Sequence, residues 1–513
     1  MKAAVTAGAL AALAVAPQAH AAGHTYTGPS SSKAPYVIPT DNAVSIASII
    51  TTGDMVGDYR FGGIPDGLGA FEPHRGSFGL LVNHELRETN GITRQHGEKG
   101  AYVSEWSISR RSLKVNAGRD FIARKTGDLA TTGVRYWDYS KSAYSTAPST
   151  GTISQMAPFY RFCSSTLTDP GQLDGPHGTG YDGQLYFANE EGGSARTFAV
   201  TEDGVATQLP RLGLYDYENT KPAYNRGVDT TVAGLEDATA NLWLYHGTKK
   251  ATGSAVDRAG LTNGDLGVIA LDNGVKTDDE FRAKVGKGTP VSWSYKTVNW
   301  NQSQSAQKSE AIAKGGTTFT RIEDGTWDPH HRNTLYFNTT SSGLPKGPTG
   351  REIGGVWKVV LNDVNDPSKG GTIELLLDGS EPPYLNMQDN MTIDNRGNLL
   401  LQEDPGNQVA LARIAAYNTK TGALKTLAQF DPKYFAPKLA DGTANPDLIT
   451  QDEESSGIIP ADHQLGGSTY LFDAQIHKAY PDPALAPELA EQGQLLAMKV
   501  NWDAFWGTEE NDD

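Results

Sequence analysis

The sequence predicts an all-β chain that folds as a β-propeller of about five or six blades with irregular insertions. Three observations lead to this prediction. Short runs of β-branched and aromatic residues recur along the chain, and turn residues bound each run. The 57 glycines and 27 prolines among 513 residues indicate many turns. The only cysteine, Cys163, excludes an intrachain disulfide framework. Self-similar strand units without disulfides are typical of a propeller, and a pair of β-sandwiches is the alternative.

The chain begins with a segment that resembles a secretory leader. Lys2 supplies positive charge, residues 3–15 are small and apolar, and residues 19–21 read Ala-His-Ala, as at a cleavage site. The apolar stretch is shorter than the roughly 20 residues that span a bilayer. We expect a leader over 1–21, then an extended segment over 22–45. A single propeller domain over 46–505 and an acidic tail over 506–513 follow. The mature chain is expected to be a periplasmic or secreted monomer without a stable membrane anchor.

The expected strands follow one another as neighbours in a meander. Between them, residues 212–226 and 291–308 are interpreted as insertions, and a helical pattern lies near 484–492. The clearest strand runs, with their expected neighbours, are at 183–188, 241–246, 267–271, 333–338, 355–361, 397–402, 468–473 and 494–500.

The charge balance limits the possible partners. The chain has 44 Lys and Arg against 60 Asp and Glu, so its formal net charge is −16. Nucleic-acid surfaces need concentrated positive charge, so this excess disfavours a nucleic-acid partner. A surplus of carboxylates suits a protein that handles cations.

Carboxylates repeatedly follow a strand or precede a glycine turn. Asp and Asn favour turns because their side chains bond to the local backbone, but Glu lacks that advantage. Neighbouring like charges repel each other, and a hard cation bound by several oxygens would offset the repulsion. Calcium is therefore the expected ion. The repeated clusters include Asn83-His84-Glu85, Glu190-Glu191, Glu236-Asp237, Glu323-Asp324, Gln388-Asp389-Asn390, Glu403-Asp404 and Asp462-His463.

Two further features suggest chemistry, each with a plainer alternative. A thiolate at Cys163 is a soft ligand that suits iron or copper better than calcium, although a lone cysteine is also a common small core residue. Arg321 and Glu323 share one face of a strand, where Arg can grip a phosphate or carboxylate group bidentately. An ordinary ion pair between them is the alternative.

The order of these motifs resembles that of the PhoX-type alkaline phosphatases, a β-propeller family. The resemblance spans roughly residues 60–475. It is carried by the segments 63–70 and 80–85, Cys163, Glu190-Glu191, Glu236, Arg321-x-Glu323, Asp389-Asn390, 397–399 and Glu403-Asp404.

The resemblance implies a calcium- and iron-dependent phosphatase with its site at one mouth of the propeller channel. By this resemblance Cys163 would bind iron, and Arg321 would contact the phosphate. Glu323 would lie beside Arg321 at the reacting centre and hold metal. The other metal ligands that it implies are Glu236, Glu190 or Glu191, and, for calcium, Asn83, Glu85, Glu403 and Asp404.

We therefore predict an exported phosphatase that hydrolyses small-molecule phosphate monoesters with Ca²⁺ and Fe³⁺. Metal ions would polarise the phosphoryl oxygens, and Arg321 would neutralise charge in the transition state. Two alternatives stay open. One is a calcium-dependent propeller esterase, lactonase or phytase-like hydrolase. The other is a calcium-stabilised propeller that binds a partner or glycan without catalysis.

Overall fold

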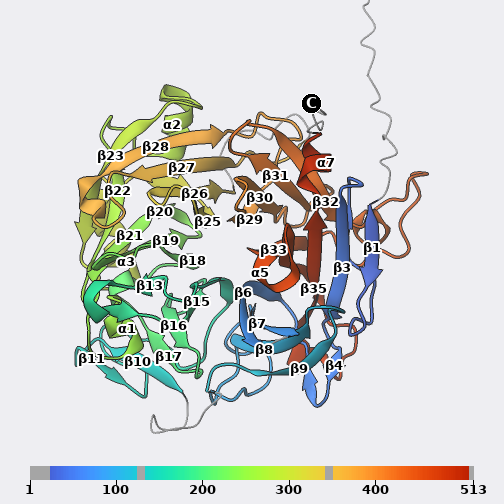
Figure 1. Ribbon diagram of the computed structural model, residues 1–513, viewed down its shortest axis with the longest axis horizontal. Coiled ribbons are helices and arrows are strands. Elements are labelled where there is room, and N and C mark those ends of the chain that lie inside the picture. Colours follow the sequence, from blue (N-terminus) through green and yellow to red (C-terminus); the bar gives the residue numbers. More distant parts are fainter. Residues whose placement is uncertain (1–22, 75, 124–132, 341–349, 508–513) are drawn as a thin grey trace, which may run out of the picture.

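The strands form a ring of six blades around a central axis, which confirms the predicted β-propeller (Figure 1). The structure, a computed structural model, describes residues 23–74, 76–123, 133–340 and 350–507, so the expected leader at 1–21 and residues 508–513 of the acidic tail lie outside it. The innermost strands of neighbouring blades contact each other around the whole ring. In ring order they are β6 (Pro65–His74), β12 (Phe162–Leu167), β18 (Tyr217–Pro222), β25 (Ile322–Trp327), β29 (Gln388–Ile393) and β33 (Glu453–Pro460).

Each blade is completed by further strands toward the outside of the ring. Blade one adds β7 (Ser77–His84), β8 (Tyr102–Ser109) and β9 (Val115–Asp120). Blade two adds β15 (Leu185–Glu190), β16 (Thr197–Thr201), β17 (Ala206–Gln208), β10 (Val134–Asp138) and β11 (Ala143–Ser145). Blade three adds β19 (Asp229–Glu236), β21 (Trp243–Thr248) and β22 (Asp265–Leu271).

The second half of the ring is built in the same way. Blade four adds β26 (Thr334–Thr339), β27 (Gly355–Leu361) and β28 (Gly371–Leu377). Blade five adds β30 (Asn398–Glu403), β31 (Arg413–Asn418), β32 (Leu424–Phe430) and β2 (Val37–Pro39). Blade six adds β34 (Thr469–Ala479), β35 (Glu491–Val500), β3 (Val44–Thr51) and β1 (His24–Thr27).

The remaining elements are short and lie in the connections. No helix in the described residues is long and apolar enough to cross a membrane. The short strands are β4 (Met55–Val56), β5 (Tyr59–Arg60), β13 (Leu173–Asp174), β14 (Gly180–Tyr181), β20 (Thr239–Asn241) and β24 (Thr318–Thr320). The helices are α1 (Ala255–Arg258), α2 (Asp278–Lys284), α3 (Gln304–Ala313), α4 (Pro432–Phe435), α5 (Asp462–Leu465), α6 (Ala486–Leu489) and α7 (Trp502–Trp506).

Two of the expected insertions have a different role in the structure. The interpretation of residues 212–226 as an insertion is wrong, because they contain β18, the innermost strand of blade three. Residues 291–308 contain β23 (Val291–Val298), which pairs with both β22 and β28 and joins blades three and four into one sheet. Neither strand could be recognised from its apolar pattern, because both carry many polar residues.

The hydrophobic core is divided among the spaces between blades. Along β15, Leu185 and Phe187 pack toward blade three, whereas Tyr186 and Ala188 pack toward blade one. Both faces of this strand are therefore buried, which explains its nearly continuous apolar run. A corresponding cluster fills each of the other spaces between blades.

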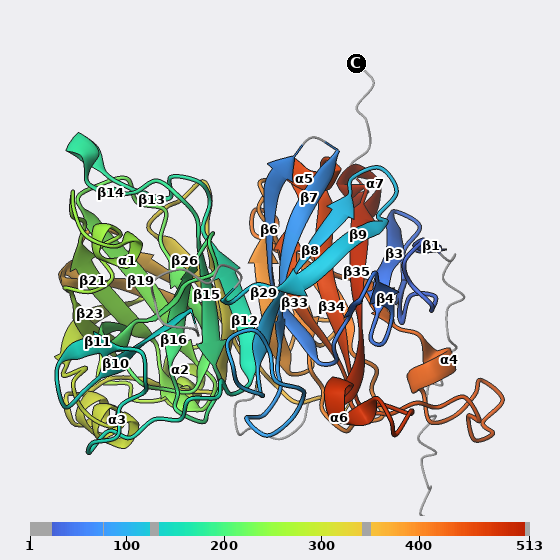
Figure 2. The same ribbon diagram turned by 90° about the horizontal axis from the view of Figure 1, so that it is seen from below.

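The ring is closed by a strand from near the N-terminus. β3 pairs antiparallel with β35, with Ile46 opposite Met498, and so completes blade six. Figure 2 shows this blade beside blade one, and β6 contacts both β33 and β34. The segment expected to be extended, 22–45, supplies β1, β2 and the first residues of β3.

Candidate active site

A β-bulge interrupts the pairing of every innermost strand with its neighbour. Such a bulge re-aims side chains and is common beside active sites. The register shifts between Pro65 and Leu68 in β6, and between Phe162 and Ser165 in β12. Corresponding shifts occur in the other four innermost strands. The residues within the six bulges include Asp66, Cys163, Glu218, Glu323, Asp389 and Gly457.

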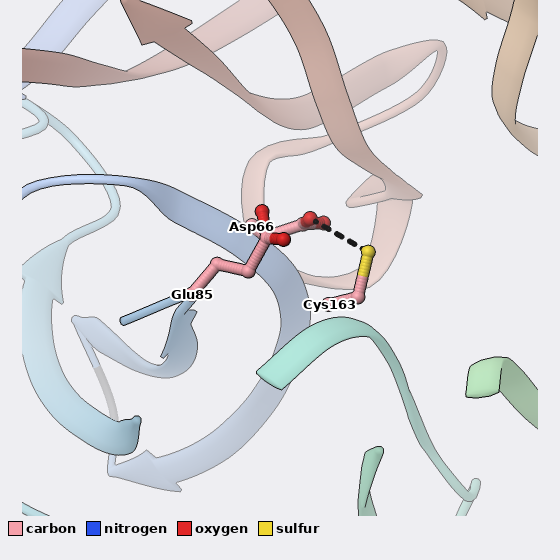
Figure 3. A group of neighbouring side chains, drawn as sticks. All are labelled: Asp66, Glu85 and Cys163. Carbon is pink, nitrogen blue, oxygen red and sulfur yellow. Dashed lines mark hydrogen bonds between the residues drawn. The ribbon is translucent and has the colours of Figure 1, made fainter. Parts of the chain in front are cut away.

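Blades one and two bring the first group of metal-ligating side chains together. Asp66, Glu85 and Cys163 are all buried, and their ligand atoms lie within 4.8 Å of one another (Figure 3). The Cys163 thiol donates to Asp66 Oδ2 at 3.3 Å. Asp66 and Cys163 come from bulges, whereas Glu85 directly follows β7. The three donors therefore come from three separate segments of two blades.

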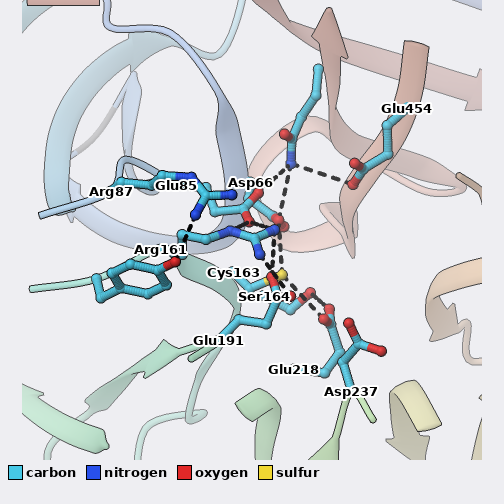
Figure 4. A network of polar contacts seen from close by, with 12 residues as sticks. Asp66, Glu85, Arg87, Arg161, Cys163, Ser164, Glu191, Glu218, Asp237 and Glu454 are labelled. Atoms are coloured by element: carbon cyan, nitrogen blue, oxygen red, sulfur yellow. Dashed lines mark hydrogen bonds and ion pairs between the residues drawn. The ribbon is translucent and has the colours of Figure 1, made fainter. Parts of the chain in front are cut away.

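A second group comes from blades three, four and five. Glu218, Glu323 and Asp389 are buried, and their ligand oxygens also lie within 4.8 Å of one another. The two groups are in direct contact, because Glu218 Oε2 accepts a hydrogen bond from the Cys163 thiol at 3.1 Å (Figure 4). The ring thus gathers six potential ligands from five blades at its axis.

Burial raises the pKa of most of these groups. It raises the pKa of Glu218 from 4.5 to about 8, and it raises those of Asp66, Glu323 and Asp389 well above their ordinary values. Neighbouring carboxylates act in the same direction. The pKa of the Cys163 thiol is also raised by burial, with Asp66 and Glu218 adding to the effect. Several buried like charges repel one another, and bound cations would offset this repulsion.

Two arginines stand beside the two groups. Arg161 precedes β12 and Arg321 precedes β25, and both have left-handed backbone, with φ of 34° and 56°. Arg161 Nε donates to Glu85 Oε1 at 2.6 Å, and its Nη1 donates to Glu191 Oε1 at 3.0 Å. Burial acts to raise the pKa of Glu85, but Arg161 brings it below its ordinary value.

Arg321 has the same relation to the second group. Its Nε donates to Asp237 Oδ1 at 2.8 Å, and its Nη2 lies 3.1 Å from Glu323 Oε1. Within the described residues Nη1 makes no hydrogen bond, and 38% of the side chain is exposed. Arg321 can therefore contact an anion without giving up its bonds to the carboxylates.

The structure brings several of the predicted site residues together. Cys163, Glu85 and Glu323 are in the two groups, and Arg321 and Glu191 lie beside them. Asn83 also lies next to the first group, because its Nδ2 donates to the backbone oxygen of Cys163. Placement does not test the role of any of these residues, so each role stays a prediction.

Three other predicted ligands lie outside both groups. Arg196 donates to both carboxylate oxygens of Glu190, at 2.6 and 2.7 Å. Arg413 donates to both oxygens of Glu403, at 2.5 and 2.9 Å. Glu236 accepts from the Trp243 indole at 2.8 Å. Glu190, Glu236 and Glu403 occupy one equivalent position, the end of the second strand of blades two, three and five.

A further predicted ligand, Asp404, follows the end of β30 and is also outside the groups. Its Oδ1 accepts from the backbone of Gly406 at 2.9 Å. The repeated Glu pattern in the sequence thus marks a repeated blade corner, and the grouped side chains come mostly from the neighbouring innermost strand.

Sequence reasoning missed two members of the groups and did not assign a third. Glu218 lies in the segment that was interpreted as an insertion, and Asp66 lies in the segment 63–70, which carried part of the resemblance. Asp389 is in one of the carboxylate clusters but was not predicted to be a ligand. An Asp or Glu inside an innermost strand, rather than at its end, is the signal that could have found all three.

Comparisons with known proteins place the chain in a family and support its fold. The family described as "Alkaline phosphatase PhoX" matches residues 200–455. A search of curated proteins finds no match. Among solved structures, Pseudomonas fluorescens PhoX in complex with vanadate aligns over 90% of this chain and 95% of its own, with 13% identity and a TM-score of 0.60.

A luciferin-regenerating enzyme aligns over 86% of this chain and 93% of its own, with 10% identity. Its TM-score of 0.34 is too low to indicate a shared fold. The likeness to the Pseudomonas structure shows the fold, and the family match covers blades three to five with the inner strands β18, β25 and β29. This chain belongs to the PhoX alkaline phosphatase family.

Proposed function

We propose that this protein hydrolyses phosphate monoesters at the propeller axis, with metal ions held by the two groups of buried ligands. One observation carries the proposal. Five blades converge on six metal-ligating side chains, and the Cys163–Glu218 contact joins them into one centre with Arg321 at its edge. A phosphatase needs positive charge around the transferred phosphoryl group, and this centre can supply it through cations and an arginine.

The donor atoms fit two kinds of ion. The carboxylates of Asp66, Glu85, Glu218, Glu323 and Asp389 suit a hard cation such as Ca²⁺. Cys163, as a thiolate, suits a transition metal better than calcium, and Fe³⁺ is the ion that we propose there. When bound, such ions polarise phosphoryl oxygens and make a water molecule a better nucleophile at neutral pH.

The chain's own residues orient the substrate. Arg321 is held by Asp237 and Glu323 through Nε and Nη2, so Nη1 can donate to a phosphoryl oxygen of the substrate. As charge develops on the equatorial oxygens, this donor stabilises the transition state more than the ground state. Vanadate, described as a transition state analogue in the Pseudomonas structure, supports phosphoryl transfer as the reaction class.

The direct test combines elemental analysis with an assay. Purified protein is expected to contain calcium and iron, to hydrolyse p-nitrophenyl phosphate, and to lose this activity in EDTA. Activity should return when Ca²⁺ and Fe³⁺ are added back. Full activity in EDTA, or hydrolysis of lactones and carboxylic esters but not of phosphate monoesters, would contradict the proposal.

We also propose that the protein acts as a monomer outside the cytoplasm on small soluble phosphoesters, with no nucleic-acid partner. The leader-like residues 1–21 and the net charge of −16 support this part. Expression of the full chain followed by fractionation should place the activity in the periplasm or the medium. Light scattering should give the mass of one chain.

A further inference from the structure

The axial centre lies at the face of the ring where the innermost strands begin, and we call this face the ligand face. Each innermost strand pairs antiparallel with the second strand of its blade, so the second strands end at the same face. Segments that precede an innermost strand or follow a second strand therefore surround the centre. Five of the grouped ligands are each the second residue of an innermost strand, namely Asp66, Cys163, Glu218, Glu323 and Asp389.

Arginines on the ligand face differ in how their charge is compensated. Arg161 and Arg321 precede β12 and β25, and each contacts two carboxylates. Arg87 follows the end of β7 and is exposed. Within the described residues it makes no ion pair, and its side chain makes one hydrogen bond, from Nη1 to the Tyr160 hydroxyl at 2.9 Å (Figure 4). The guanidinium edge formed by Nε and Nη2 is thus available for a ligand.

Arg87 is held in place beside the first group of ligands. Its neighbour Leu86 accepts, through the backbone oxygen, a hydrogen bond from the backbone of Arg161 at 2.9 Å. The segment of Arg87 therefore lies beside the segment that carries Tyr160. Tyr160 is itself tightly seated, because a Cβ on Gly193 would stand 2.6 Å from its Cβ and Cγ. This packing fixes the Tyr160 side chain, whose hydroxyl orients Arg87.

Arg87 and Arg321 stand on opposite sides of the axial centre. Arg87 belongs to blade one and Arg321 to blade four, and these blades are opposite each other in the ring of six. The phosphoryl group is proposed to contact Arg321, so the leaving group can extend across the centre toward Arg87. A free Nε and Nη2 edge is the part of arginine that binds a carboxylate or a phosphate with two parallel hydrogen bonds.

We propose that Arg87, oriented by Tyr160, binds a second acidic group in the leaving-group part of the substrate, a carboxylate or a phosphate. This inference rests on the proposed phosphatase activity, and it favours phosphoesters that carry a further negative charge. Arg87 contacts none of the grouped ligands in the described residues, so its role is to select the substrate.

The test uses two substrates that differ at one end. 3-Phosphoglycerate has a carboxylate where glycerol 3-phosphate has an uncharged CH₂OH group. Arg87→Gln, as the metal-loaded full chain, is expected to lower kcat/KM for 3-phosphoglycerate about tenfold and for glycerol 3-phosphate less than twofold. The loss should appear mainly in KM, because the contact is made equally in the ground state and the transition state.

Two further variants separate the charge from its orientation. Tyr160→Phe removes only the hydroxyl, so it should lower the preference for 3-phosphoglycerate by a smaller factor. Arg87→Lys keeps the charge but not the two-donor edge, so it should restore part of the preference. Fructose 1,6-bisphosphate compared with fructose 6-phosphate gives the same measurement for a second phosphate. A selective loss in only one of the two substrate pairs identifies the acidic group.

Arg332→Gln is the control. Arg332 is exposed and follows the end of β25, so it lies at the opposite face of the ring and carries the same charge. Its removal should change every rate less than twofold. The inference is overturned if Arg87→Gln lowers the rates for both members of each pair equally or not at all, or if Arg332→Gln gives the same loss of preference.

The experiment also separates this inference from the proposed function. Wild-type protein that hydrolyses glycerol 3-phosphate and p-nitrophenyl phosphate, with a substrate preference unchanged in Arg87→Gln, overturns the role of Arg87 alone. Wild-type protein that hydrolyses no phosphoester in the presence of Ca²⁺ and Fe³⁺ overturns the proposed function, and the role of Arg87 with it.

Discussion

At the residue scale, the backbone of the two arginines shows how the site is organised. Non-glycine residues with positive φ are uncommon and tend to occur at functional sites. Arg161 and Arg321 both have this conformation, and both directly precede an innermost strand whose bulge supplies a ligand. The left-handed residue turns each side chain back toward the carboxylates of the axis.

We expect Arg321→Ala to lower kcat/KM for p-nitrophenyl phosphate by about 10²- to 10³-fold, the usual effect of removing one transition-state donor. The ions should remain, since Arg321 is not in either ligand group. Steady-state kinetics with elemental analysis checks both points. Arg119→Ala, which removes a half-exposed ion pair with Glu105, is the control and should change the rate less than twofold. A similar small effect for Arg321→Ala would contradict its role.

Removal of the metal should make the stability depend strongly on pH. Burial raises the pKa of Glu218 from 4.5 to about 8, so the folded protein keeps a proton that the unfolded chain has already released. This contribution to stability is complete below pH 4.5 and is lost as the pH rises through about 8. The loss reaches about 1.4 kcal/mol per pH unit for this one group. Urea midpoints in EDTA should therefore fall between about pH 4.5 and about pH 8.

Glu218→Gln is the matched variant for this measurement. The amide cannot lose a proton, so unfolding of this variant should release about one proton fewer than unfolding of the wild type. The urea midpoint should therefore fall less steeply with pH. Added Ca²⁺ should restore the wild-type midpoint mostly at the high-pH end, because ligands must be deprotonated to bind metal. An unchanged slope in Glu218→Gln would show that other groups account for the effect.

At the scale of the element, each innermost strand combines a bulge with close packing against the next blade. Gly67 shows why the packing leaves no room for a side chain. A Cβ on Gly67 would stand 2.3 Å from the backbone nitrogen of Ser165 in β12. Backbone cannot yield as a flexible side chain can, so blades one and two would have to separate at the point where Asp66 meets Cys163.

Gly67→Ala is therefore expected to destabilise the fold by about 1–3 kcal/mol, the usual range for overpacking. It should also lower the metal content, because Asp66 and Cys163 would move apart. Urea unfolding and elemental analysis measure the two effects. Gly467→Ala is the control, because a Cβ there meets nothing within 4 Å. Equal stability of the two variants would contradict the argument.

The strands of this ring could be predicted from sequence better than its site. Runs such as 397–402 are apolar on both faces, because Leu400 packs toward blade six and Leu399 and Leu401 pack toward blade four. Innermost strands such as β18 carry Glu218, Asn219 and Thr220, so their pattern resembles that of a loop.

The candidate site could be predicted where its chemistry is unusual. The single cysteine and the Arg-x-Glu pair at 321–323 could be recognised as candidate site residues from residue type alone. Glu190 and Glu403 carry the same residue type as a ligand, yet each is paired with an arginine. Arg196 directly precedes the next strand of its hairpin, and Arg413 begins the next strand of the other. Strand register decides which carboxylate faces an arginine and which faces the axis. This register is not visible in the residue pattern of the sequence.

At the scale of the whole molecule, the ring is held closed by β3 in blade six. Ile46 is 1% exposed and packs in the cluster between blades five and six. Ile46→Ala should lower the free energy of unfolding by about 2–5 kcal/mol, the usual cost of this substitution in a core. Ser45→Ala, on the half-buried face of the same strand, should change it by less than about 0.5 kcal/mol. Urea unfolding monitored by tryptophan fluorescence tests both, and equal effects would argue against a closing role for β3.

The closure by β3 also affects the order in which the contacts of the ring form during folding. This strand is made near the start of synthesis, but its partner strand follows 452 residues later, since Ile46 lies opposite Met498. Contacts of such long range form late and slowly. Until they form, five blades with their carboxylates stay an open arc, and Asp66 in blade one has no settled neighbour in blade six. We therefore expect the complete centre at the axis, with all six ligands, to form only after the ring has closed.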